Sequence, residues 1–227
     1  MERQTMGIAG ISRDGQDGRV SVAYPSYTGS DTLPRQIAAR LAENAAVNAA
    51  IAQRQCEIIA RMAGCIVNAY RNGGKLLIFG NGGSAADAQH IAGEFMGTFL
   101  VRSRRALPAL ALSTNTSIVT ALANDFGYET IFARQVEALA REEDVVMGIS
   151  TSGKSANVVA AIKMAKHKRA TTMVLTGCDG GILANIADYA FVAPSDSTPR
   201  IQEAHITVGH IICEIVEQAF TRNEPGS

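Results

Sequence analysis

Residues 76–84 read LLIFGNGGS, a short apolar run that leads directly into a glycine-rich turn. A second stretch of this kind, VVMGISTSGKS, occupies residues 145–155. Each turn precedes a segment whose apolar residues have helical spacing. Glycine lets the backbone approach a ligand closely, and the free N–H groups of the following helix attract anions, so such turns typically bind phosphate. A tight strand-to-helix connection without a ligand is the alternative interpretation.

A third glycine-rich turn, GCDGG at residues 177–181, follows a later apolar run but carries fewer hydroxyl groups, and we interpret it as structural. The strict dinucleotide fingerprint GxGxxG is absent from all three turns, so a dinucleotide is only weakly indicated. The two hydroxyl-rich turns therefore predict a phosphate site without identifying the rest of the ligand.

Composition limits the class of protein. The 227 residues are 47% hydrophobic, enough for one domain with a sizeable core, and 21 basic residues balance 21 acidic ones. Aromatic residues make up only 5%, and the densest basic cluster, residues 102–105, is short and is expected to be a solvated loop. These values argue against a nucleic-acid partner.

The cysteines and the N-terminal region indicate a cytoplasmic protein without a membrane partner. The chain contains no CxxC pair, so neither a disulfide framework nor a thiolate metal site is indicated. Residues 1–30 lack the apolar region of a signal peptide, and no stretch is long enough to span a membrane. The four cysteines, expected as free thiols, are Cys56, Cys65, Cys178 and Cys213.

The N-terminal third divides into an arm and a helical region. Residues 1–30 are rich in Gly, Ser, Arg and Asp and are predicted to be a flexible arm, with Met6 as a conceivable alternative start. From Asp31 an alanine-rich region runs to about Tyr70 and is expected to form two helices that end at NGG, residues 72–74. Its wide apolar stripe predicts packing against a neighbour, for which another subunit is a candidate.

Beyond residue 74, apolar strands and helices alternate, which predicts an α/β fold with a parallel sheet covered on both faces and right-handed crossovers. Ligands bind such sheets beyond the carboxyl ends of the strands, where both hydroxyl-rich turns fall. The expected strands are 75–79, 107–112, 144–149, 171–176 and 188–193, and the expected helices are 84–101, 117–140, 154–168, 180–187 and 200–221.

Two expected helices carry residues with metal-ligand or acid–base chemistry. His90 and Glu94 are four residues apart and share one helix face. Gln202 and His210 are eight residues apart, about 80° around a helix, and can point to one side. His205 is five residues from His210, a spacing that places it on another side of the helix, and it is therefore the weaker candidate. Imidazole, carboxylate and amide groups suit a divalent ion, although Gln is an unusual zinc ligand. A structural histidine and a surface His–Glu pair are the alternatives.

The segment ANDFG at residues 123–127 is predicted to be a turn after a helical stretch. Asn124 and Asp125 in this turn either cap the next helix or bind hydroxyl groups of a substrate, and the sequence leaves both functions open.

Taken together, these residues resemble the sugar isomerase (SIS) domain family and, more narrowly, its phosphoheptose isomerases. The glycine-rich turns fit any SIS domain, whereas His90, Glu94, Gln202 and His210 as a set are more specific. The resemblance covers roughly residues 33–221, through GNGGSAADAQHIAGEF at 80–95, ANDFGYETIFARQVEAL at 123–139, GISTSGKSANV at 148–158, LTGCDGG at 175–181 and RIQEAHITVGHI at 200–211.

The resemblance implies a three-layer α/β/α SIS domain at residues 31–223 with a flavodoxin-like, five-stranded parallel sheet. Residues 31–72 would be oligomerisation helices of a homotetramer with sites between subunits, and residues 75–221 the α/β core. It also implies isomerisation of D-sedoheptulose 7-phosphate to D-glycero-D-manno-heptose 7-phosphate through an enediol(ate). That reaction begins the synthesis of nucleotide-activated heptose for lipopolysaccharide core or capsule.

The resemblance further implies the role of each site residue. One Zn²⁺ per subunit would be held by His90, Glu94, Gln202 and His210, and Glu94 and His210 would be the catalytic acid and base. The residues implied in substrate binding are Asn81, Gly82, Gly83, Ser84, Glu94, Asn124, Asp125, Ser150, Thr151, Ser152, Ser155 and Gln202.

One position departs from the family pattern, which commonly has an Arg four residues after the Glu. This chain has Thr98 there, with Arg102, Arg104 and Arg105 nearby as candidates to compensate. Two other functions stay open. A non-catalytic SIS protein that binds the bacterial replication initiator lacks counterparts of Glu94 and His210, so their presence favours the enzyme. An isomerase of another ketose phosphate would use the same residues.

Overall fold

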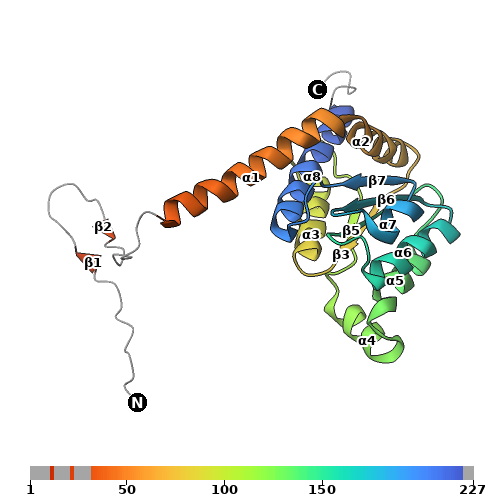
Figure 1. Ribbon diagram of the computed structural model, residues 1–227. Coiled ribbons are helices and arrows are strands. Elements are labelled where there is room, and N and C mark those ends of the chain that lie inside the picture. Colours follow the sequence, from red (N-terminus) through yellow and green to blue (C-terminus); the bar gives the residue numbers. More distant parts are fainter. Residues whose placement is uncertain (1–10, 13–20, 23–31, 222–227) are drawn as a thin grey trace, which may run out of the picture. The chain divides into compact units, whose positions relative to one another are not determined.

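The computed structural model describes residues 11–12, 21–22 and 32–221 (Figure 1). The chain divides into two units, Met1–Ala42 and Glu43–Ser227, and helix α1 (Thr32–Arg54) runs from the first into the second. Strand β1 (Ile11–Ser12) pairs antiparallel with β2 (Ser21–Val22). Apart from this pair, the flexible arm predicted for residues 1–30 lies outside the described residues.

The two helices predicted between residue 31 and Tyr70 are present. After α1, helix α2 (Cys56–Arg71) buries one face that includes Ile59, Met62 and Ile66. After Asn72, Gly73 has a φ of +79° and the backbone N–H of Gly74 bonds to the carbonyl of Ala69, which ends the helix at the predicted NGG turn.

The main sheet is parallel and follows the order β4-β3-β5-β6-β7. This is the flavodoxin-like order, in which the chain reverses direction across the sheet between the first and third strands, here β3 and β5. The predicted fold class is therefore confirmed. The strands are β3 (Leu76–Gly80), β4 (Ala109–Ala111), β5 (Val145–Ser150), β6 (Thr171–Thr176) and β7 (Tyr189–Val192).

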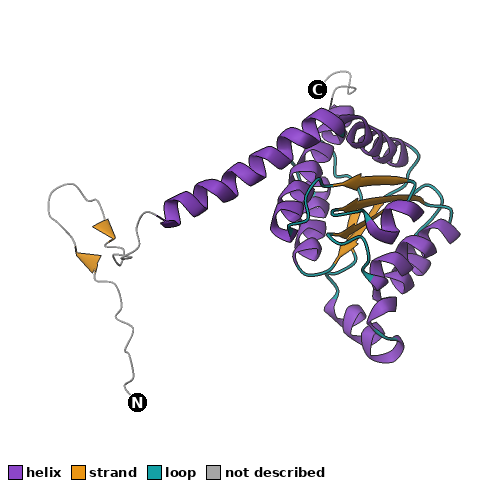
Figure 2. Cartoon of the chain, viewed as in Figure 1, coloured by secondary structure: helices purple, strands orange, loops and turns teal. Residues whose placement is uncertain are grey.

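Helices cover both faces of the sheet because alternate strand residues point to opposite sides. Leu76 and Ile78 pack with α2, α3 and α8, whereas Leu77 and Phe79 pack with α5, α6 and α7. Figure 1 shows α3 and α8 on one side of the sheet and α5 and α6 on the other, and Figure 2 shows the strands between these helical layers. The helices are α3 (Gly83–Met96), α4 (Thr116–Phe126), α5 (Ile131–Leu139), α6 (Ala156–His167), α7 (Gly181–Ile186) and α8 (Thr198–Thr221).

Two helix predictions were wrong in extent. The helix expected at 84–101 ends at Met96, and the chain continues without regular structure to β4. The helix expected at 117–140 is divided at Gly127, whose φ of +88° lies outside the helical region, and a 3-10 turn (Tyr128–Thr130) leads into α5. Within the described part of the chain, no helix has the length and apolarity needed to cross a membrane.

Candidate functional site

Helices α3 and α8 lie against each other where their histidines meet. Gly209 precedes His210 on α8, and a Cβ at this position would lie only 2.7 Å from Cδ1 of Ile91 on α3. The missing side chain therefore allows α8 to approach α3 closely, next to His90. Tertiary packing, rather than sequence proximity, brings the two histidines together.

Three side chains from these helices converge. The Nε2 atom of His90 is 3.1 Å from Oε1 of Glu94 and 3.3 Å from Nε2 of His210. Ligand atoms of all three residues lie within 4.8 Å of one another, and the two imidazole rings meet edge to face. The His90 side chain is 48% exposed and that of Glu94 is 22% exposed, so a ligand from solvent can reach the group.

This geometry fits a divalent ion of the zinc class. Tetrahedral zinc binds nitrogen and oxygen ligands at about 2.0–2.2 Å, which separates neighbouring ligand atoms by about 3.3–3.6 Å. The two separations that involve His90, 3.1 and 3.3 Å, are close to that range, and the ligand atoms of all three residues lie within 4.8 Å of one another. Moreover, Nε2 of a histidine has one in-plane position, occupied by a hydrogen or a lone pair, and so cannot bond well to a carboxylate and a second imidazole at once. A cation between the three groups would satisfy all of them.

The other two candidates on α8 have different surroundings. The amide of Gln202 lies against Gly83 at the start of α3, because a Cβ added to Gly83 would be 2.6 Å from its Nε2. Its role as a fourth ligand therefore stays a prediction. His205 is fully buried, and its Nε2 is 2.9 Å from the carbonyl of Thr176 on β6. Burial lowers the pKa of His205 to about 4, so it is a neutral structural residue and does not join the group.

The first glycine-rich turn is stabilised by a reciprocal amide pair. The side chain of Asn81 donates to and accepts from that of Asn157 on α6, at 2.9 Å in both directions. Tyr128 also donates its hydroxyl to Oδ1 of Asn81 at 3.0 Å. Asn157 is buried and was not expected from the sequence, since an Asn in the first turn of a helix is common without a function. It fixes the side chain of a predicted substrate-binding residue.

The second turn places hydroxyl groups beside the start of α6. The Oγ atoms of Ser150 and Ser155 are 2.9 Å apart, and Ser152 accepts from the backbone N–H of Lys154. Ser155 precedes α6 but forms no side-chain cap. Because β3 and β5 are adjacent, both hydroxyl-rich turns lie at the point where the strand order reverses, which is the usual ligand position in such sheets.

Residues 148–155, GISTSGKS, also fit the spacing GxxxxGK[ST] of a nucleotide-binding P-loop. In the structure, Gly148 and Ile149 are inside β5, so the free loop is shorter than the motif requires. The Lys154 ammonium pairs with Asp179 at 3.2 Å and is thereby directed to the third turn. The pattern therefore does not form a P-loop.

The remaining predicted residues give mixed results. Asn124 and Asp125 are exposed and belong to the C-terminal end of helix α4, not to a loop after it. The N-cap of α5 is Thr130, so the hypothesis that they cap the next helix was wrong.

The expectation of a solvated loop at 102–105 was also wrong for Arg104, which is 6% exposed and held by internal contacts. Arg104 cannot compensate for Thr98, and Arg105 lies over the ring of Phe220 at 4.9 Å.

The SIS domain model matches residues 41–177. A protein named phosphoheptose isomerase from Aquifex aeolicus is 54% identical over 176 residues, which are 78% of this chain and 92% of that protein. The structure of a phosphoheptose isomerase from Neisseria gonorrhoeae superimposes with a TM-score of 0.78 at 40% identity, over 82% of this chain and 99% of that one. One from Francisella tularensis also has a TM-score of 0.78, at 34% identity, over 81% and 97%. The chain therefore belongs to the SIS domain family and, within it, to the phosphoheptose isomerases.

Proposed function

We propose that this chain interconverts D-sedoheptulose 7-phosphate and D-glycero-D-manno-heptose 7-phosphate. The observation that carries the proposal is the convergence of one carboxylate, Glu94, with the imidazoles of His90 and His210, in a chain that belongs to the phosphoheptose isomerases. Aldose–ketose exchange needs a base at carbon and an acid–base group at oxygen, and these residue types provide both. Binding of the replication initiator is not favoured, because the matched relatives are named as isomerases.

In the proposed mechanism, Glu94 takes a proton from C1 of the ketose while the C1–C2 enediolate forms, and returns it to C2 to give the aldose. His210 moves the second proton from O1 to O2 through the ring nitrogen that is not a metal ligand, so that no net proton is gained or lost. The Glu94 side chain is 22% exposed, so a substrate that enters from solvent can reach its carboxylate. Zinc, when bound, would polarise the carbonyl and the neighbouring hydroxyl.

The phosphate is proposed to bind at the second turn, through the hydroxyls of Ser150, Thr151, Ser152 and Ser155. Support comes from the start of α6, whose dipole attracts an anion without a cluster of basic side chains. Asn81, Gly82, Gly83 and Ser84 are proposed to line the same site, with Asn124 and Asp125 contacting sugar hydroxyls. His90, Glu94, Gln202 and His210 are proposed as ligands of one zinc ion.

We also propose that the protein is a cytoplasmic homotetramer and supplies a pathway of nucleotide-activated heptose. All four cysteines are free thiols, as expected in a reducing compartment.

An apolar groove between α1, α2 and α8 is lined by residues that include Ile51, Ile59, Ile211 and Ile215. Ile211 and Ile215 are each 38% exposed, and a second copy of the chain is the proposed occupant. Ile215→Arg should lower the molar mass measured by light scattering; an unchanged mass would contradict this interface.

The central experiment follows the conversion of sedoheptulose 7-phosphate by NMR, with and without a chelator. Turnover that the chelator stops and added zinc restores is the expected result. Turnover that does not respond to chelation would support the proposed isomerase activity and contradict its proposed dependence on a metal. Failure to convert this substrate with zinc present, together with conversion of a shorter ketose phosphate, would show that the substrate assignment is wrong.

A further inference from the structure

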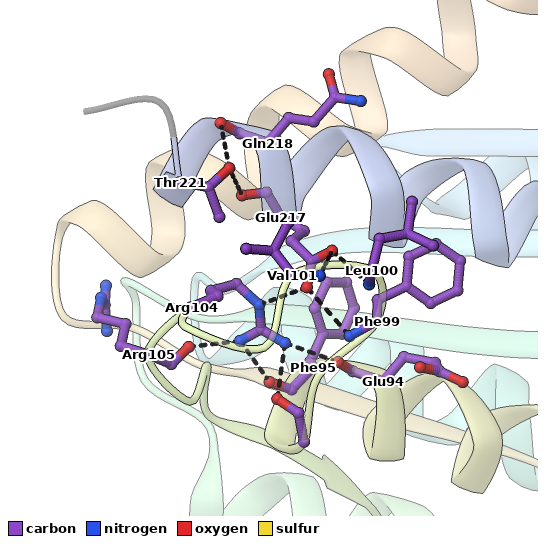
Figure 3. A network of polar contacts seen from close by, with 11 residues as sticks. Glu94, Phe95, Phe99, Leu100, Val101, Arg104, Arg105, Glu217, Gln218 and Thr221 are labelled. Atoms are coloured by element: carbon purple, nitrogen blue, oxygen red, sulfur yellow. Dashed lines mark hydrogen bonds and ion pairs between the residues drawn. The ribbon is translucent and has the colours of Figure 1, made fainter. Parts of the chain in front are cut away.

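A buried arginine closes the C-terminal end of α3. Its Nη2 donates to the carbonyls of Glu94 and Gly97, both at 2.9 Å, and its Nη1 donates to those of Phe95 and Arg105. This residue is Arg104, and its fifth N–H, at Nε, bonds to Glu217 (Figure 3). All five donors of the guanidinium are therefore used, and its charge lies at the negative end of the helix dipole.

The partner carboxylate is equally well satisfied. Glu217 on α8 is 2% exposed, and its oxygens accept from Nε of Arg104 at 3.0 Å and from the backbone N–H groups of residues 99–101 at 2.7–3.1 Å (Figure 3). Burial acts to raise the pKa of Glu217, but the N–H of Leu100 and the Arg104 guanidinium outweigh it, and the pKa is lowered. The carboxylate is therefore charged and holds the chain that follows α3.

The pair connects the two helices that carry the converging group. Arg104 bonds to the backbone carbonyl of Glu94 itself. Glu217 follows His210 by seven residues, which is about two helical turns and returns to nearly the same face of α8. A displacement of either partner would move the Glu94 carboxylate relative to the His210 imidazole.

We propose that Arg104 and Glu217 are positioning residues that hold α3 against α8 and thereby keep Glu94 and His210 at the separation that the metal and the substrate need. This inference rests on the proposed function, since it assigns the pair a role in that same site. Neither residue reaches the reacting atoms. Their effect passes through the backbone of Glu94 and through the rigid helix α8.

The test compares Glu217→Gln with Asp144→Asn as a matched control. Asp144 is also 2% exposed and paired with a lysine, at 2.6 Å, but its carboxylate bonds to Lys75 and to the backbone N–H of Arg141, neither of which lies on α3 or α8. Both variants should have a lowered Tm. Cobalt(II) titration of each purified protein, followed by its visible absorption, should show affinity reduced at least about tenfold in E217Q, as for other residues that orient ligands, and nearly unchanged in D144N. The kcat of the zinc-loaded protein should fall in E217Q with a smaller change in KM.

Equal cobalt affinity and equal kcat in E217Q and D144N would overturn the inference and make the pair structural only. Should E217Q not fold, Arg104→Lys takes its place, because lysine keeps the charge but cannot supply five donors in one plane. A wild-type protein that binds cobalt but does not convert the heptose phosphate would contradict the proposed function, while the cobalt comparison still tests the pair. A wild-type enzyme that is active without binding cobalt would leave the kcat comparison as the test.

Discussion

Two polar clusters bridge the same pair of helices in different ways. The first, formed by His90, Glu94 and His210, is open to solvent, and the Nε2 of His90 faces two groups that it cannot bond to equally well. The second, formed by Arg104 and Glu217, is buried and has a partner for every guanidinium donor. They lie about two turns apart along α8.

This contrast gives a criterion that distinguishes a structural ion pair from a binding or catalytic site. A buried charge is tolerated only when its hydrogen-bonding capacity is filled, and Arg104 and Glu217 meet that condition. Ligand and catalytic groups must instead keep capacity free for what they bind. By this criterion, losses in the buried cluster should affect stability first, and losses in the open cluster should affect activity with little change in stability.

Glu94→Gln should produce the largest effect on activity. The amide keeps the shape of the side chain but cannot act as a base, so kcat should fall by about 10²- to 10⁴-fold. The free energy of unfolding should change by less than about 1 kcal/mol, because the residue is partly exposed. Steady-state kinetics and urea denaturation measure the two quantities, with Gln89→Ala on the same helix as a control. Retention of most activity in E94Q would contradict the catalytic role assigned to the solvent-accessible cluster.

Glu217→Ala should produce the largest effect on stability. Removing one partner of a buried ion pair leaves the other charged and unpaired, which costs about 3–5 kcal/mol. Urea denaturation of this variant and of Glu94→Ala compares the two clusters directly. If both variants lost the same stability, the distinction between them would be incorrect.

A third contact of α8 is expected to give a smaller, pH-dependent effect. The pKa of His205 is lowered to about 4 in the folded protein, below its unfolded value near 6.5. Between these values the unfolded chain binds more protons, so stability falls as the pH decreases from 6.5 towards 4. This residue alone should remove about 2 kcal/mol between pH 7 and pH 5. In His205→Asn, the urea midpoints at the two pH values should differ less than in the wild type. An equal difference in both proteins would show that another group causes the pH dependence.

Tyr128→Phe should give the smallest effect. Its hydroxyl bond to Asn81 lies outside both clusters, and the side chain is 55% exposed. Loss of one hydrogen bond of about 0.5–1.5 kcal/mol leaves Asn81 less well held, so KM should rise by about two- to tenfold and Tm should fall by no more than a few degrees. Asn157→Ala, which removes the buried partner of the same amide, should have the larger effect of the two on KM. The reverse order would show that Tyr128 contacts the substrate.

Much of the fold was predictable because apolar runs and turn residues are local signals. The strands before both hydroxyl-rich turns and the two N-terminal helices all follow from such patterns. The helix ends were harder to predict. Residues 97–101 have helical spacing, but the helix stops at Met96 because Glu217 binds three backbone N–H groups and Arg104 takes the last carbonyls. A residue more than 110 positions away decides that boundary.

Local sequence patterns were sufficient to predict the parallel α/β fold, the family, and the pairing of His90 with Glu94, because a four-residue spacing places both on one helix face whatever the helix packs against. Packing between distant elements places His210 beside them, buries His205 against β6, and holds Arg104 inside the protein rather than in a solvated loop. The physical reason is that these outcomes depend on how α3 and α8 approach each other. That approach is set by Gly209 and by a buried ion pair between residues far apart in the chain.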